Sequence, residues 1–304
     1  ILHGFPTNGD PFGVTMELKE NNRVQVLVSK ARFQMAGIPR DDYPVLPEFQ
    51  EESAIQFSAA ALSDMIQKTI FAVSSDEARY MLNGAMFFLS SGTVALVATD
   101  GRRLAAVRTE GFAADKSFKA IVPSKALVEI SRIIGHFDPQ MTSDQKILID
   151  VSENRLGFRL GETTLFSRLI EGNFPNWEQV IPRKAGVCVK VNRENFLAVT
   201  KRASVCITDR VGTCRYKFFK NQCHVASKTL GHYEFEEEMD VLNYEGEEGL
   251  EVAFTPAHLV DFLKNINSQV VEIYITTAVN PVLFVSPDNP NYSYVVMPTR
   301  VQQN

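Results

Sequence analysis

Residues 57–74 read FSAAALSDMIQKTIFAVS and residues 191–208 read VNRENFLAVTKRASVCIT, 134 positions further along the chain. Both stretches carry apolar residues at intervals of three and four, the spacing of a helix that is buried along one side. Aligned without a gap, the stretches match at four helix positions: Leu62 with Phe196, Met65 with Val199, Ile66 with Thr200, and Val73 with Ile207. Self-similarity at a fixed distance predicts a repeated folding unit.

Further segments repeat at nearly the same distance. AMFFLSSGTVALVATD at 85–100 and RYKFFKNQCHVASKTL at 215–230 each show an aromatic pair, a turn and a second strand-like run, which is typical of a hairpin. Residues 120–137 and 253–266 each pass from a short strand through a proline into an amphipathic helix. The opening residues 1–5 resemble 133–137, so the chain is expected to start inside a repeat.

Each full repeat is expected to be an α+β domain with two helices packed on antiparallel sheets. Domain boundaries are expected in two linkers, YPVLPEFQEES at 43–53, which is rich in proline and acidic residues, and VIPRKAG at 180–186. These place the C-terminal part of a first domain at 1–50, a second domain at 51–183 and a third at 184–304.

The bulk composition limits the classes of protein that fit. The 304 residues are 45% hydrophobic, which suits several globular domains better than one. No apolar stretch approaches the ~20 residues of a membrane span, and the four cysteines form no CxxC pair, so we expect a soluble, cytoplasmic protein. The net charge of -5 argues against a protein that holds nucleic acid mainly through overall positive charge.

Four short motifs occur in order along the chain: RYMLNG at 79–84, VATDGRRLA at 97–105, EGNFP at 171–175 and YVVMPTR at 294–300. Together they resemble the signatures of the bacterial DNA polymerase sliding clamps, the beta subunits of DNA polymerase III. Arg102 stands where histidine is commoner in that family. Relative to the family, the first part of the first domain is absent, and residues 301–304 extend past the usual end.

The resemblance implies a DNA clamp fold and a function without catalysis. Such a protein is a processivity factor of DNA replication. Two copies pair head to tail into a homodimeric ring that encircles duplex DNA without reading its sequence. The replicative polymerase and clamp-loader subunits dock on the ring through short peptide motifs. The resemblance implies no cofactor, no metal and no catalytic residue.

A peptide-binding pocket between the second and third domains is the most detailed implication of the resemblance. An apolar floor with a polar rim suits a peptide that inserts apolar side chains. The alternative is that 295–297 is only a buried strand and Thr99-Asp100-Gly101 only a tight turn. The pocket would be formed by Leu82, Thr99, Gly101, Arg102, Arg103, Leu104, Pro175, Val180, Val211, Thr255, His258, Val295, Val296, Met297, Pro298, Thr299 and Arg300.

DNA contacts are expected from basic residues on the helices and from the RYMLNG loop. Acidic residues crowd positions 234–251 instead, in a strand-and-loop stretch away from the expected hole. The alternative is that the basic residues lie on ordinary solvated helix faces. The expected contacts are Arg79, Tyr80, Met81, Lys125, Lys201 and Arg202.

The dimer interface is expected where the strand around Phe33 and Met35 meets Val205 and Cys206 of a second copy. Apolar residues on an unpaired strand edge need a cover. The alternative is that Phe33 and Met35 point into the core of the first domain.

Two functions of other classes stay open. One is a repeat-built, peptide-binding scaffold unrelated to DNA, and the other is a metal-dependent hydrolase. The five histidines lie in none of the common catalytic motifs. The acidic residues at 236–240 fit a solvated loop better than a cation site.

Overall fold

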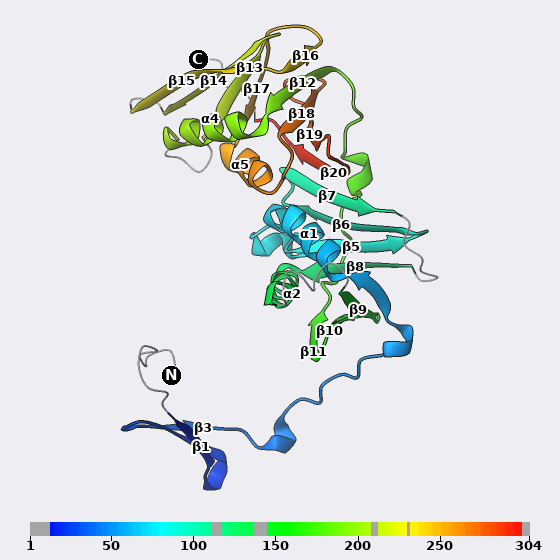
Figure 1. The fold of residues 1–304 in the computed structure, drawn as a ribbon, viewed down its shortest axis with the longest axis vertical. Coiled ribbons are helices and arrows are strands. Elements are labelled where there is room, and N and C mark those ends of the chain that lie inside the picture. The colour runs from blue at the N-terminus through cyan, green and yellow to red at the C-terminus, as the bar shows by residue number, and fades with distance from the viewer. Residues whose placement is uncertain (1–12, 111–116, 137–144, 208–211, 230–231, 300–304) are drawn as a thin grey trace. The chain divides into compact units, whose positions relative to one another are not determined.

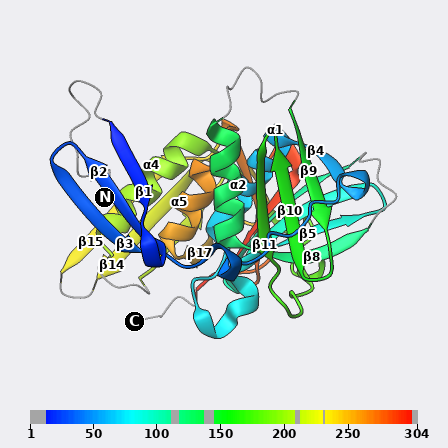
Figure 2. The same ribbon diagram turned by 90° about the horizontal axis from the view of Figure 1, so that it is seen from below.

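The computed structural model describes residues 13–110, 117–136, 145–207, 212–229 and 232–299. The chain forms two compact units, Ile1–Glu48 and Phe49–Asn304. In the first unit an antiparallel meander holds Val26 and Val28 in its buried face (Figure 2). Its strands are β1 (Val14–Leu18), β2 (Arg23–Val28) and β3 (Ala31–Ala36). The expected likeness of residues 1–5 to a helix end lies outside the described residues.

The first half of the second unit alternates helices with groups of strands, as predicted. Its elements are β4 (Ile55–Ser58), α1 (Ala59–Thr69), β5 (Gly84–Ser90), β6 (Thr93–Thr99), β7 (Arg103–Thr109), β8 (Phe118–Pro123), α2 (Ser124–His136), β9 (Lys146–Val151), β10 (Arg155–Leu160) and β11 (Thr163–Arg168).

The second half repeats this order with one additional short strand, β16. Its elements are β12 (Val187–Asn192), α4 (Arg193–Val205), β13 (Cys214–Phe218), β14 (Gln222–Thr229), β15 (Tyr233–Asp240), β16 (Asn243–Glu245), β17 (Leu250–Phe254), α5 (Pro256–Lys264), β18 (Val270–Ile275), β19 (Val282–Ser286) and β20 (Asn289–Val296).

The strand orders of the two halves also correspond. The order β4-β9-β10-β11 of the first half matches β12-β18-β19-β20 of the second, and β8-β5-β6-β7 matches β17-β13-β14-β15. The predicted α+β fold of repeated units, with helices packed on antiparallel sheets, is therefore confirmed. The division at 183/184 stays a prediction, because residues 49–304 form one compact unit.

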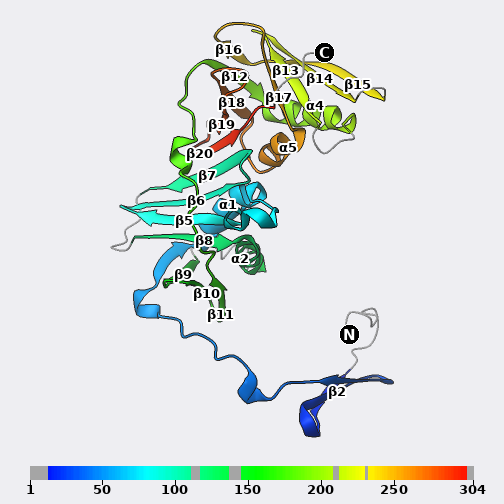
Figure 3. The same ribbon diagram turned by 180° about the vertical axis from the view of Figure 1, so that it is seen from behind.

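The two halves are joined by strand pairing as well as by the chain. β20 pairs antiparallel with β7, from Tyr292 opposite Val107 to Val296 opposite Arg103. This pairing fuses one sheet of each half into a nine-stranded sheet. Helices α1, α2, α4 and α5 lie on one side of the sheets of this unit (Figure 1 and Figure 3). The joint between the repeats is thus a continuous backbone ladder.

Matching caps explain why the matching helices begin where they do. The side chain of Ser58 accepts a hydrogen bond from the Ala61 N–H before α1, and Asn192 does the same for the Asn195 N–H before α4. Such a cap stabilises a helix by about 1 kcal/mol. Leu62 of α1 and Phe196 of α4, at equivalent positions, are buried on the inner faces of these helices. Among the described residues, no helix has the length and apolar character to span a membrane.

Candidate functional site

The turn between β6 and β7 is fixed by its own side chains. The Asp100 carboxylate accepts hydrogen bonds from the N–H groups of Arg102 and Arg103, at 2.8 and 3.0 Å. The Thr99 hydroxyl donates to the Arg103 carbonyl at 2.7 Å and accepts from the Gly101 N–H at 3.1 Å. Gly101 has φ +85°, in the left-handed region that favours glycine. The turn is therefore rigid, and it exposes Arg102 to solvent.

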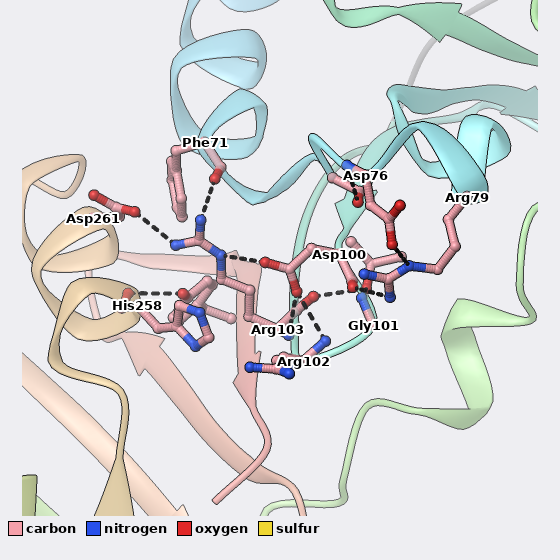
Figure 4. A network of polar contacts seen from close by, with 12 residues as sticks. Phe71, Asp76, Arg79, Asp100, Gly101, Arg102, Arg103, His258 and Asp261 are labelled. Carbon is pink, nitrogen blue, oxygen red and sulfur yellow. Dashed lines mark hydrogen bonds and ion pairs between the residues drawn. The ribbon is translucent and has the colours of Figure 1, made fainter. Parts of the chain in front are cut away.

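Arg103 connects this turn to the other half of the unit. Its Nε donates to Asp100 Oδ2 at 3.0 Å, its Nη1 to Asp261 Oδ2 on α5 at 2.7 Å, and its Nη2 to the Phe71 carbonyl at 2.6 Å (Figure 4). Only 11% of the side chain is exposed. Burial alone would lower the pKa of this guanidinium, but the neighbouring side chains of Tyr294, Asp261 and Asp100 raise the pKa above its ordinary value. Arg103 therefore stays charged, and its N–H groups donate to acceptors in both halves of the unit.

The end of β20 lies against the same turn. Val295 pairs with Leu104, and the Met297 N–H donates to the Arg102 carbonyl at 2.8 Å. The Tyr294 hydroxyl donates to the His258 carbonyl on α5 at 2.8 Å. Segments about 190 residues apart in sequence thus form one surface.

The connector between the halves, residues 169–186, covers the face of the nine-stranded sheet that points away from the helices. Phe174 and Trp177 of the connector are buried with Leu82, Leu104 and Val295 in one apolar cluster. Beside this cluster Val180 and Met297 remain 40% and 39% exposed. An apolar ledge with Arg102 at its edge is an arrangement that suits an apolar peptide anchor.

Most of the predicted pocket residues come together here. Thr99, Leu82 and Val296 are buried, so they support the surface and do not form its exposed part. The predicted residues on the connector and near α5 are Pro175, Val180, Thr255 and His258, and those following β20 are Met297, Pro298 and Thr299. Val211 and Arg300 lie outside the described residues. The pocket assignment as a whole stays a prediction.

His258 adds a titratable group to this site. Burial is the main cause that lowers the pKa of its imidazole, and the nearby positive charge of Arg103 lowers it further. The histidine is therefore neutral at pH 7, so the positive charge of the site comes from arginine.

A separate depression of about 380 Å³ lies along the edge strand β8. Its floor includes Met86, Ile121 and Phe174, and its rim includes Lys119 and Glu171. It contains none of the predicted pocket residues. This depression was not predicted from the sequence.

The loop predicted to touch DNA lies next to the β6–β7 turn. Arg79 and Tyr80 belong to a short 3-10 segment, Glu77–Leu82, in which Tyr80 is exposed and Met81 packs on the apolar cluster. The Arg79 guanidinium donates from Nε to Asp76 at 3.0 Å and from Nη1 to the Asp100 carbonyl at 2.7 Å. Arg79 is thus already bound within the protein.

The other predicted DNA contacts lie on two helices. Lys125 of α2 and Lys201 of α4 are exposed. Arg202 is different, because its Nε donates to Glu237 of β15 at 2.7 Å. The acidic strand β15 therefore neutralises one of the basic residues expected to face DNA.

The residues predicted at the dimer interface lie in different units. Phe33 and Met35 are on β3, where Met35 is exposed and Phe33 half-buried. Val205 ends α4 and is exposed, and Cys206 follows it, half-buried. Their meeting across two copies stays a prediction.

Several residues that build the site were not predicted from the sequence: Phe71, Asp76, Asp100, Phe174, Trp177 and Asp261. The Asp-Gly turn signal could have identified Asp100, and Phe174 is part of the EGNFP motif. Asp261 has no local signal, because its partner Arg103 is 158 residues away. Among the residues that the structure describes, no group of three His, Cys, Asp or Glu could hold a metal ion.

Two family models match the chain. Residues 56–176 match the DNA polymerase III beta subunit, central domain, and residues 178–300 match the DNA polymerase III beta subunit, C-terminal domain. The beta sliding clamp of Haemophilus influenzae is 31% identical over 282 residues, which are 93% of this chain and 75% of that protein. The one of Synechococcus elongatus is 31% identical over 310 residues, 99% and 79% of the two chains.

Solved structures are similar over the same extent. The DNA polymerase sliding clamp of Bacillus subtilis matches with a TM-score of 0.85 at 27% identity, over 95% of this chain and 75% of that one. The DNA polymerase III subunit beta of Pseudomonas aeruginosa matches with a TM-score of 0.84 at 25% identity, over 97% and 79%.

Proposed function

Because the chain belongs to the family of DNA polymerase III beta subunits, the non-catalytic beta sliding clamps, we propose that it is a processivity clamp of DNA replication. Two copies would form a head-to-tail ring around duplex DNA and tether the replicative polymerase and clamp-loader subunits. The protein would act in the cytoplasm and would need no cofactor. The single observation that carries this proposal is the ladder between β7 and β20, which joins two like halves edge to edge.

Equivalence between strands supports the ring. β15 has the place in the second half that β7 has in the first, and β11 has the place of β20. In the first unit β3 ends a three-stranded meander as β20 ends β18-β19-β20. We therefore propose that β3 of one copy meets β15 of a second copy much as β20 meets β7. Phe33 and Met35 would then lie near Val205 and Cys206 of the second copy.

The charge distribution supports a tether that slides. Lys125 and Lys201 are exposed on helices that share one side of the sheets, and acidic side chains concentrate on β15. A closed ring stays on DNA because it encircles the duplex, so it needs only weak contacts with the phosphates. We propose Arg79, Tyr80, Met81, Lys125, Lys201 and Arg202 as these contacts.

The docking site for partners is proposed on the ledge formed by the β6–β7 turn, the connector and the end of β20. Exposed Met297 and Val180 supply apolar surface above a packed cluster, and Arg102 supplies charge. Peptides with apolar anchors bind such surfaces. Arg103, which is nearly buried, would hold the shape of the site and make little direct contact.

Retention on closed DNA tests the proposal. The protein is loaded onto a nicked circular plasmid by its clamp loader and passed through a gel-filtration column at a salt concentration that removes non-specific binders. We expect co-elution with the circle, and loss of the protein when a restriction enzyme linearises the plasmid. A peptide-binding scaffold would fail to stay on either DNA, and a protein that simply grips DNA would stay on both.

A further inference from the structure

The Arg79 side chain is held in place by two groups from different parts of the chain. Its Nε donates to the Asp76 carboxylate and its Nη1 to the main-chain carbonyl of Asp100 (Figure 4). The side chain nevertheless stays 48% exposed. Within the described residues its Nη2 donates to no partner. The guanidinium is therefore oriented by the protein and keeps donor capacity for a ligand outside it.

Both holding groups are themselves fixed. The Asp76 carboxylate also accepts from the Ala78 N–H at 3.0 Å, and the Asp76 N–H donates to Ser74 Oγ at 3.1 Å. The Asp100 carbonyl belongs to the rigid β6–β7 turn. Fixing a long arginine side chain in advance reduces the rotamer entropy that binding would otherwise cost.

Gly101 provides the space in which Arg79 lies. A Cβ atom at this position would stand 2.9 Å from Arg79 Nη1. Cβ atoms in proteins essentially never come this close to another heavy atom. The residue also has φ +85°, so a side chain would strain the turn. A substitution at Gly101 would therefore push Arg79 away from the Asp100 carbonyl and leave the charge of the protein unchanged.

We propose that Asp76 and Gly101 are positioning residues that aim Arg79 at a DNA phosphate. This inference rests on the proposed clamp function and assigns roles to residues that touch no DNA themselves. The Arg79 Nη2 would donate to a phosphate oxygen, and Nε and Nη1 would stay on Asp76 and Asp100. Charge-assisted hydrogen bonds from an oriented guanidinium to phosphate are stronger than those from a mobile one.

The sign of the effect at Asp76 separates this proposal from simple electrostatics. Asp76 carries a negative charge next to the proposed phosphate position, so its removal should strengthen DNA binding if charge alone matters. If Asp76 aims Arg79, its removal weakens DNA binding instead. Asp76→Asn preserves the size of the side chain and removes only the charge.

The test measures binding of a fluorescently labelled duplex to the full chain by anisotropy, over a range of salt concentrations. We expect Arg79→Ala to reduce the slope of log K against log salt by about 0.9, the loss of one phosphate contact. Asp76→Asn and Gly101→Ala should each weaken binding about twofold to fivefold. Neither should weaken it further in an Arg79→Ala background, since the two residues act through Arg79.

Matched controls separate positioning from general effects. Asp64 pairs with Lys68 at 2.6 Å on α1, so Asp64→Asn removes a similar exposed paired carboxylate, and we expect it to keep or strengthen DNA binding. Gly135→Ala adds a Cβ that meets no atom within 4 Å, so it should leave DNA binding unchanged. Circular dichroism and thermal melting verify the fold of each variant.

Three outcomes would overturn the inference. They are tighter binding by Asp76→Asn, a further loss in the Arg79→Ala background, and an unchanged salt slope in Arg79→Ala. Each can occur with a protein that still stays on circular DNA, which would leave the clamp function standing. A protein that fails to stay on circular DNA would remove the proposed function instead.

Discussion

Replacing Arg103 tests how far one side chain holds the two halves of the second unit together. Arg103→Met keeps an unbranched apolar side chain as far as the position of Nε but removes three hydrogen bonds, to Asp100, Asp261 and the Phe71 carbonyl. Breaking a buried ion pair from one side costs about 3–5 kcal/mol, because the remaining charge is left without its partner. The Asp261 side chain is 38% exposed and can be hydrated, so we expect the lower limit, about 3 kcal/mol.

Trp177 allows this cost to be measured where it arises. It is the only tryptophan of the chain and is buried in the connector cluster, so its fluorescence reports unfolding of this unit. A loss of about 3 kcal/mol should lower the melting temperature by roughly 6–12 °C and lower the urea midpoint. Asp261→Asn should cost only about 1 kcal/mol, because Arg103 keeps Asp100 and the Phe71 carbonyl.

The ranking of the two variants is what can refute the reasoning. If Arg103→Met lowers the free energy of unfolding by less than about 1 kcal/mol, the ion pairs of Arg103 contribute no more than exposed ion pairs do, despite their burial. If Asp261→Asn costs as much as Arg103→Met, the contact with α5 would carry the whole effect, and the turn and Phe71 would contribute nothing.

Three further predictions follow from the site and its surroundings. Met297→Ala should weaken binding of a polymerase clamp-contact peptide by about 1–2 kcal/mol in isothermal titration, whereas Val279→Ala, at an exposed position elsewhere, should have no effect. Iodoacetamide labelling of the folded protein, diluted until the copies separate, followed by mass spectrometry should modify half-buried Cys206 before Cys214, because burial raises the pKa of the Cys214 thiol to about 12. The pKa of His258 in the folded protein lies below its unfolded value, so the free energy of unfolding should fall as the pH drops below about 6.5. His258→Gln should reduce this loss of stability, measured by urea titrations at pH 7 and pH 5. An equal pH dependence in the two proteins would contradict the prediction.

Local patterns explain what could be predicted from the sequence. The helices were predicted at 57–74 and 191–208, and in the structure α1 and α4 begin at Ala59 and Arg193 behind Ser58 and Asn192 caps. Spacing and caps are properties of neighbouring residues, so one sequence contains them. The same holds for the turn at Asp100 and Gly101.

Contacts between distant segments explain what could not be predicted. The Arg103–Asp261 pair and the pairing of β7 with β20 join residues far apart in the chain. No spacing rule relates such residues, since their meeting depends on how the two halves pack. The resemblance placed Arg103 and Val296 in one pocket. The structure shows instead that Arg103 joins the two halves through its hydrogen bonds and that Val296 is buried.

The charges of the edge strands argue for one arrangement of two copies. β15 carries five acidic residues in eight, so two β15 strands paired with each other would bring carboxylates opposite one another. Like charges at opposed positions destabilise a strand pair, and charged edges are a common protection against unwanted sheet growth. β3 carries Arg32 and no acidic residue, so it can pair with β15 without that repulsion. We therefore expect association through β15 to be head to tail, and that is the polarity that two copies need to close a ring.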